Sequence, residues 1–120
     1  MISSFSIRYH HDIVTRPAKV EVSVYQQNKK LYQRTVDLRY FQSPLHIDFE
    51  FGSLDPIQLI FETCCTDMDL FPFYIDRIEF DELIDVPFVA HAGKLVSLTG
   101  TEDTTNCLYC AGALTYTFAL

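Results

Sequence analysis

Three aspartates, Asp67, Asp69 and Asp76, lie close together in a sequence of 120 residues. Calcium takes six to eight hard oxygen ligands, often carboxylates on one loop together with loop carbonyls. Asp67 and Asp69 flank a single methionine, so both carboxylates would sit on one loop. This spacing indicates a calcium site as one reading, although the twelve-residue calcium-loop pattern and its glycine are absent. The alternative reading is turn capping and surface charge.

The four cysteines form a second candidate site. Cys107 and Cys110 have the two-residue separation of zinc ligands or redox pairs, whereas Cys64 and Cys65 are adjacent. Adjacent strand residues point to opposite faces, so only one of that pair could join Cys107, Cys110 and a histidine such as His91 around zinc. Calcium is therefore the favoured cation and zinc the lesser one. Buried free thiols and a disulfide are the alternatives.

Catalysis finds little support in the residue patterns. A cysteine nucleophile could use one of the four histidines, His10, His11, His46 and His91, as its base. No nucleophile elbow, zinc-protease motif or glycine-rich phosphate loop is present. We therefore predict no catalytic residues and lean against an enzyme.

Aromatic side chains suggest binding instead. Tyr25, Tyr32, Tyr40 and Phe41 fall at outward positions or in connections, as does Tyr109. A tyrosine offers a flat apolar face and a polar tip, which suits stacking on a sugar or filling a partner's pocket. We take the first four as candidate ligand-binding residues, with ordinary half-buried sheet aromatics as the alternative.

The elements that would position these residues are strands. Alternation of apolar and polar side chains, with turn formers between the runs, predicts about eight short strands and no helix. This pattern favours an all-β, antiparallel, jelly-roll-like sandwich. We expect strands near 4–10, 19–25, 31–38, 46–51, 57–63, 73–80, 95–98 and 113–120, an edge or broken strand within 83–92, and a loop over 99–106.

Two details of the pattern make sharper predictions. Residues 46–63 are predicted to form a hairpin at the centre of the core. Ile47, Phe49 and Phe51 of its first arm should face the same side as the apolar residues of its second arm. In residues 73–80 the alternation slips in the middle. A β-bulge near Asp76 and Arg77 would return the four apolar side chains of that run to one face.

Length and charge limit the function classes. We expect a single β-sandwich domain over residues 1–120. The net charge of −7 argues against nucleic acid and anionic lipid as partners. Residues 1–45 hold seven basic and three acidic side chains (+4), whereas residues 46–120 hold two basic and thirteen acidic ones (−11). The acidic half could attract a basic partner or a cation.

Location and membrane contact follow from the same composition. No apolar run approaches the roughly 20 residues of a membrane helix, so we expect no membrane insertion. The first residues lack the features of a signal peptide. We expect a cytoplasmic protein, with a secreted mature domain as the alternative.

The segment from Asp69 to Phe80 resembles a strand of galactose-binding-like jelly rolls and carbohydrate-binding modules. It carries an aromatic residue followed by Ile75-Asp76-Arg77-Ile78 after an acidic loop, and the resemblance covers about fifteen residues around this segment. The resemblance implies a jelly roll, sugar binding through aromatic side chains and, in some members, structural calcium. Tryptophan is absent, and the family's sugar-contacting residues have no identifiable counterparts here.

The favoured hypothesis is a non-catalytic binding module that takes carbohydrate, with a structural cation. The first alternative is a structural or protein-interaction subunit that self-assembles as a homo-oligomer or binds a basic partner. The second alternative is a small enzyme with a carboxylate or Cys–His site.

Overall fold

A computed structural model describes residues 2–12, 14–40, 43–64, 72–80, 84–87 and 93–118, and for residues 84–87 it describes the backbone alone. Eleven strands make up the secondary structure of these residues, and no helix occurs among them. The all-β prediction is therefore confirmed. The strands are β1 Ile2–His10, β2 Lys19–Gln26, β3 Lys29–Asp37, β4 Leu45–Glu50, β5 Ile57–Thr63, β6 Phe73–Phe80, β7 Ile84–Pro87, β8 Lys94–Ser97, β9 Glu102–Thr104, β10 Cys107–Leu108 and β11 Gly112–Phe118.

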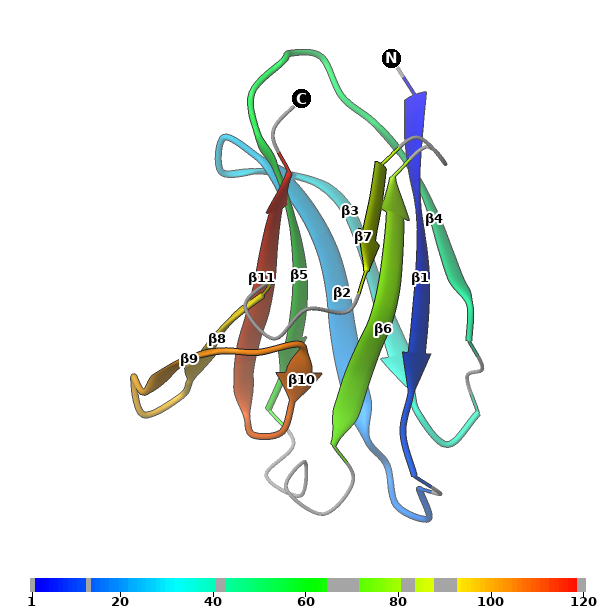
Figure 1. The fold of residues 1–120 in the computed structure, drawn as a ribbon, viewed down its shortest axis with the longest axis vertical. Helices are drawn as coiled ribbons and strands as arrows, with labels where there is room; N and C mark the ends of the chain where they lie inside the picture. The colour runs from blue at the N-terminus through cyan, green and yellow to red at the C-terminus, as the bar shows by residue number, and fades with distance from the viewer. Residues whose placement is uncertain are drawn as a thin grey trace.

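The strands form two antiparallel sheets that face each other (Figure 1). One has the order β10-β6-β1-β4, with β7 pairing to β6 as its fifth strand. The other has six strands in the order β3-β2-β5-β11-β8-β9. Each sheet turns one face toward the other sheet. Because successive residues of a strand point to opposite faces, apolar residues on the inward face alternate with polar residues on the outward face.

The predicted hairpin over residues 46–63 is wrong. β4 pairs with β1 in the five-stranded sheet, whereas β5 lies between β2 and β11 in the six-stranded sheet. The connecting loop carries the chain from one sheet to the other. Ile47 and Phe49 of β4 and Leu59 and Phe61 of β5 are all buried, so the predicted burial is confirmed although the two strands belong to different sheets.

The predicted β-bulge is confirmed. Arg8 of β1 pairs with Arg77, and the next residue, Tyr9, pairs with Ile75, so Asp76 is the extra residue on β6. The bulge corrects the slip in parity, because all four apolar side chains of β6 are buried: Phe73, Ile75, Ile78 and Phe80.

Aromatic rings fill the interior between the sheets. The ring of Phe5 lies 5.4 Å from that of Phe49, 5.0 Å from that of Phe80 and 5.1 Å from that of Phe118, measured between centroids. These four rings come from both sheets and are buried. Each buried side chain of this size stabilises the fold by about 1.5–3 kcal/mol relative to exposure.

The strand count differs from the prediction at the polar end of the chain. Residues 99–106, expected to be a loop, contain β9, which pairs with β8 although all three of its side chains are exposed. Because no side chain of β9 is buried, its sequence shows no alternation of apolar and polar residues from which a strand could be predicted. β10 has two residues only. The expected edge strand over 83–92 is confirmed as β7, which pairs with β6 alone among the described residues.

Candidate functional site

The outer face of the six-stranded sheet presents polar side chains at the end where β11, β8 and β9 run together. Paired residues in antiparallel strands share a face. Lys94 of β8 pairs with Thr115 of β11 on one side and with Thr104 of β9 on the other. Leu114 and Tyr116 alternate with the threonines and are buried, so Thr115 and Thr117 point outward.

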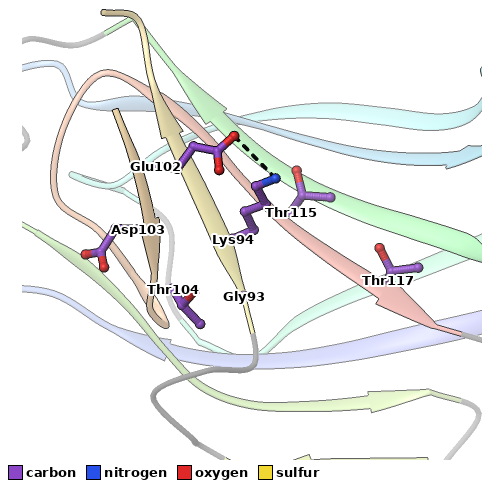
Figure 2. A pocket seen from close by; sticks show the side chains of 7 residues that line it. All are labelled: Gly93, Lys94, Glu102, Asp103, Thr104, Thr115 and Thr117. Atoms are coloured by element: carbon purple, nitrogen blue, oxygen red, sulfur yellow. Dashed lines mark ion pairs between the residues drawn. The ribbon is translucent and has the colours of Figure 1, made fainter. Parts of the chain in front are cut away.

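This face is hollowed into a depression of about 620 Å³. Its volume falls within the usual range for small-molecule sites. We call it the threonine depression. Its lining residues, shown in Figure 2, are Gly93, Lys94, Glu102, Asp103, Thr104, Thr115 and Thr117.

Charged side chains on β8 and β9 border the threonine depression. The Nζ atom of Lys94 lies 3.3 Å from Oε1 of Glu102, and Figure 2 shows the two side chains facing each other. The hydroxyl of Tyr109 donates a hydrogen bond of 2.6 Å to Oδ2 of Asp103. This bond raises the pKa of Tyr109 to about 12, because the carboxylate favours the protonated phenol. Each of the two carboxylates of the depression therefore has a polar side chain within contact distance.

The start of β8 needs a glycine at position 93. A Cβ atom built on Gly93 would lie 2.7 Å from the carbonyl oxygen of Thr105 and 2.9 Å from side-chain carbons of Leu114 and Tyr116. The amide of Thr105 also donates a hydrogen bond of 3.0 Å to the carbonyl oxygen of Gly93. This close approach holds Lys94 and Thr104 next to β11.

The described lining groups are hydroxyls, two carboxylates and one ammonium, with no aromatic ring among them. Hydroxyls both donate and accept hydrogen bonds, carboxylates accept and ammonium groups donate. This set matches a ligand rich in hydroxyl groups. The prediction from aromatic residues missed all seven positions. The signal available in the sequence was the pair of threonines at alternate, outward positions of the last strand.

The structure does not bring the candidate tyrosines together. Tyr25 is half-buried on the outer face, with Nζ of Lys30 5.6 Å from its ring centroid. Tyr32 packs against the core from β3, and Tyr40 is 78% exposed in the turn after β3. Tyr25 and Tyr40 lie near opposite ends of the β2–β3 pair, roughly 20 Å apart at about 3.3 Å per residue. Phe41 lies outside the described residues.

The candidate calcium ligands are only partly described. Asp76 lies on the bulge of β6, and its Oδ1 atom is 2.6 Å from Nδ1 of His10. Asp67 and Asp69 lie outside the described residues. Within the described part of the chain, no group of three or more histidine, cysteine, aspartate or glutamate side chains is placed to hold a metal.

The cysteines are free thiols where the structure describes them. Cys64 is exposed, and Cys107 and Cys110 are partly buried. Burial raises the pKa of Cys107 to about 11 and also raises the pKa of Cys110, so both thiols stay protonated at neutral pH. Cys65 lies outside the described residues, and so does His91, the histidine suggested as a zinc ligand.

The three described histidines contact oxygen atoms. His10 contacts Asp76, His46 contacts Asp48 at 3.2 Å, and Nδ1 of His11 lies 2.7 Å from the backbone carbonyl oxygen of Asp12. A nucleophilic cysteine needs a base that takes its proton. These contacts, together with the raised thiol pKa values, do not assemble such a pair from the described residues.

Comparison with known proteins gives a match in structure and none in sequence. No protein-family model matches the chain, and no curated protein matches it significantly. A solved structure of vCBM60 in complex with galactobiose superposes with a TM-score of 0.58 at 10% identity, covering 96% of this chain and 99% of that one.

A second solved structure is the selenomethionine form of vCBM60, from work linking two families of calcium-dependent carbohydrate-binding modules by circular permutation. It superposes with a TM-score of 0.55 at 12% identity, covering 95% of this chain and 89% of that one. The fold is therefore the jelly-roll-like sandwich of carbohydrate-binding modules, as the segment from Asp69 to Phe80 implied.

Proposed function

We propose that this protein is a non-catalytic module that binds carbohydrate in the threonine depression. The observation that carries the proposal is the likeness to the galactobiose-bound module, which extends over 96% of this chain. Because that likeness concerns the fold alone, the place of binding is argued from the residues of this chain.

The threonine depression supports the proposal through its chemistry. A sugar presents several hydroxyl groups, each able to donate and accept a hydrogen bond. Thr115 and Thr117 offer hydroxyls from one rigid strand, and the Lys94–Glu102 pair offers a charged donor and a charged acceptor 3.3 Å apart. Hydrogen bonds to charged groups are roughly twice as strong as neutral ones.

Calcium is a separate question, because calcium-dependent modules share this fold. Calcium requires six to eight oxygen ligands. The described residues include one of the three candidate aspartates, Asp76, and it is engaged with His10. The described residues alone therefore do not fit the ion, and the proposed binding step uses none. Titrations with calcium and with EDTA will test whether Asp67 and Asp69 add the missing ligands.

The central experiment is calorimetric titration with neutral disaccharides, galactobiose first. The variants Thr115→Val and Thr117→Val remove single hydroxyls and keep side-chain shape. Each should weaken binding by about 2–10-fold, the equivalent of the 0.5–1.5 kcal/mol of one hydrogen bond.

A matched control lies on the same face of the sheet. Thr35 is exposed on β3, at the far edge from the threonine depression. Thr35→Val makes the same chemical change and should leave the affinity unchanged. Equal affinities of all three variants and the unaltered protein, or no binding of any neutral sugar, would reject the proposed function.

A further inference from the structure

Two hollows adjoin on the outer face of the six-stranded sheet, and a third follows at its edge, between the β2–β3 turn and residues 50–53 of the β4–β5 connection. The threonine depression shares Thr117 with a second hollow of about 330 Å³, which is bordered by Pro56 and Gln58. That second hollow shares Gln27 with a third, of about 610 Å³. The register places Thr117 beside Gln58 of β5, and Gln58 beside Tyr25 of β2. The hollows therefore follow one path from β9 to the turn between β2 and β3.

This path is long. Between Lys94 and Gln27 it crosses three strand spacings, from β8 through β11 and β5 to β2, and advances about four residues along the strands. With strands about 4.8 Å apart and residues about 3.3 Å apart, the two ends are separated by roughly 20 Å. A ligand that occupies the whole path must be a chain of several linked units.

The third hollow has a different lining from the first, and we call it the hairpin groove. Gln27, Lys29 and Leu31 border it on the β2–β3 side, and Glu50 and Phe51 on the β4–β5 side. Leu31 and Phe51 are partly buried against the core and form its apolar floor. Leu31 is the extra residue of a β-bulge, because Val24 pairs with Tyr32 while Tyr25 pairs with Lys30.

A pyranose ring fits this combination of surfaces. Its carbon–hydrogen face can lie on a phenylalanine ring, and its hydroxyls can reach polar groups at the rim. The rim of the hairpin groove carries Lys29 and Glu50, and that of the threonine depression carries Lys94 and Glu102. A cation accompanies an anion at both ends, which favours a neutral ligand, and the net charge of −7 disfavours an anionic one.

The hairpin groove is held in shape by a buried glutamine. Gln26 is only 6% exposed, and its Nε2 atom donates hydrogen bonds to the carbonyl oxygens of Ser53 at 3.0 Å and Asp55 at 2.8 Å. These bonds join the two walls. Gln27 and Asn28 have φ angles of 49° and 63°, typical of the tight turns that join twisted strands. A groove with fixed walls loses little conformational entropy when a ligand enters it.

We propose that the hairpin groove is a second sugar subsite, so that the protein binds a linear, neutral oligosaccharide laid along the path from the threonine depression. This inference rests on the proposed function, because it assumes that the first sugar units bind in the threonine depression. It adds the ligand's length and a second point of attachment at Phe51.

The test compares chain lengths in two variants at one position. Galacto-, gluco- and xylo-oligosaccharides from the disaccharide to the hexasaccharide are titrated by calorimetry. A Cβ atom at Gly52 would meet nothing within 4 Å. Gly52→Ile therefore obstructs the hairpin groove without crowding the core, and Gly52→Ala is the matched control. A second variant, Phe51→Leu, removes the ring but keeps most of the apolar volume.

In the unaltered protein the hexasaccharide should bind at least about tenfold more tightly than the disaccharide. Gly52→Ile and Phe51→Leu should remove that difference while leaving disaccharide affinity unchanged, and Gly52→Ala should behave like the unaltered protein. Equal affinity for short and long chains would overturn the second subsite, and so would hexasaccharide binding that Gly52→Ile leaves intact. If the threonine variants also had no effect, or no sugar bound, the proposed function itself would fail.

Discussion

The hydroxyl of Tyr116 donates a hydrogen bond of 2.5 Å to Oδ1 of Asn106 in the interior of the sandwich. Tyr116 belongs to β11, and Asn106 precedes β10, so the bond ties the polar connection between β9 and β10 to the six-stranded sheet. Asn106 also accepts a backbone hydrogen bond of 2.8 Å from the amide of Ile75 on β6. This residue therefore links both sheets through buried polar contacts.

We predict that Tyr116→Phe destabilises the protein by about 1–3 kcal/mol. The substitution removes a buried donor and leaves Oδ1 of Asn106 without that bond in a dry environment. Chemical denaturation followed by fluorescence or circular dichroism measures the change. An unfolding free energy equal to that of the unaltered protein would show that the bond contributes nothing net.

Tyr9→Phe should have the opposite outcome. The hydroxyl of Tyr9 is buried and has no hydrogen-bond partner among the described residues, and burial raises the pKa of Tyr9 to about 12. Removing an unpaired buried hydroxyl should leave the unfolding free energy unchanged or raise it by about 1 kcal/mol. The same denaturation experiment applies, with Tyr116→Phe as the comparison. A decrease in the unfolding free energy of more than about 1 kcal/mol would show that the Tyr9 hydroxyl has a hydrogen-bond partner.

Gly93→Ala should destabilise the protein by about 1–3 kcal/mol, because the new methyl group would overlap the Thr105 carbonyl and two core side chains. Gly52→Ala is the control, since a methyl group there meets open space. Thermal melts of the two variants measure the difference. Similar melting temperatures would mean that β8 shifts to make room.

The pair formed by Asp37 and Arg39 predicts a dependence of stability on acid pH. Arg39 donates to both carboxylate oxygens of Asp37, through Nε at 3.2 Å and Nη2 at 2.9 Å. These hydrogen bonds lower the pKa of Asp37 from 3.8 to about 2. A carboxyl whose pKa is depressed by folding stabilises the fold above its unfolded value and loses that contribution as the pH falls.

Asp37→Asn should therefore lower the melting temperature at neutral pH and have less effect as the pH falls from about 4 to about 2. The measurement is a series of thermal melts across this range. Arg39→Gln should reproduce the loss. If the melting temperature of Asp37→Asn stayed below that of the unaltered protein by the same amount at every pH in this range, the contribution would be ruled out.

Gln26→Met should release the loop that forms one wall of the hairpin groove. The variant keeps the side-chain volume but removes the hydrogen bonds to Ser53 and Asp55, at a cost of about 1–3 kcal/mol. Amide hydrogen exchange should accelerate at residues 53–55 before it does elsewhere. Gln33→Met, at an exposed position of β3, should leave exchange at residues 53–55 unchanged. Unchanged exchange in Gln26→Met would show that other contacts hold the loop.

The strands and the bulge could be predicted from local patterns because each depends on neighbours in the sequence. Phe5 and Ile7 alternate with polar residues because one face of β1 must be buried, and this requirement holds whichever strand pairs with it. Ile75 and Ile78 lie at positions of opposite parity, and one extra residue at a bulge between them is enough to place both side chains on the same face. β9 could not be predicted from the sequence, because its side chains are all exposed and show no apolar–polar alternation; only backbone pairing holds it beside β8.

Partner choice and the hollows depended on tertiary structure. Alternation shows which side of β4 and β5 is buried, but it does not show that β4 pairs with β1 and β5 with β2 and β11. The threonine depression combines residues from β8, β9 and β11, and the hairpin groove combines two loops. The amino-acid sequence by itself determined the burial pattern, since burial follows from side-chain chemistry. Only the packing of the two sheets decided which polar groups meet, because that depends on contacts between segments far apart in the chain.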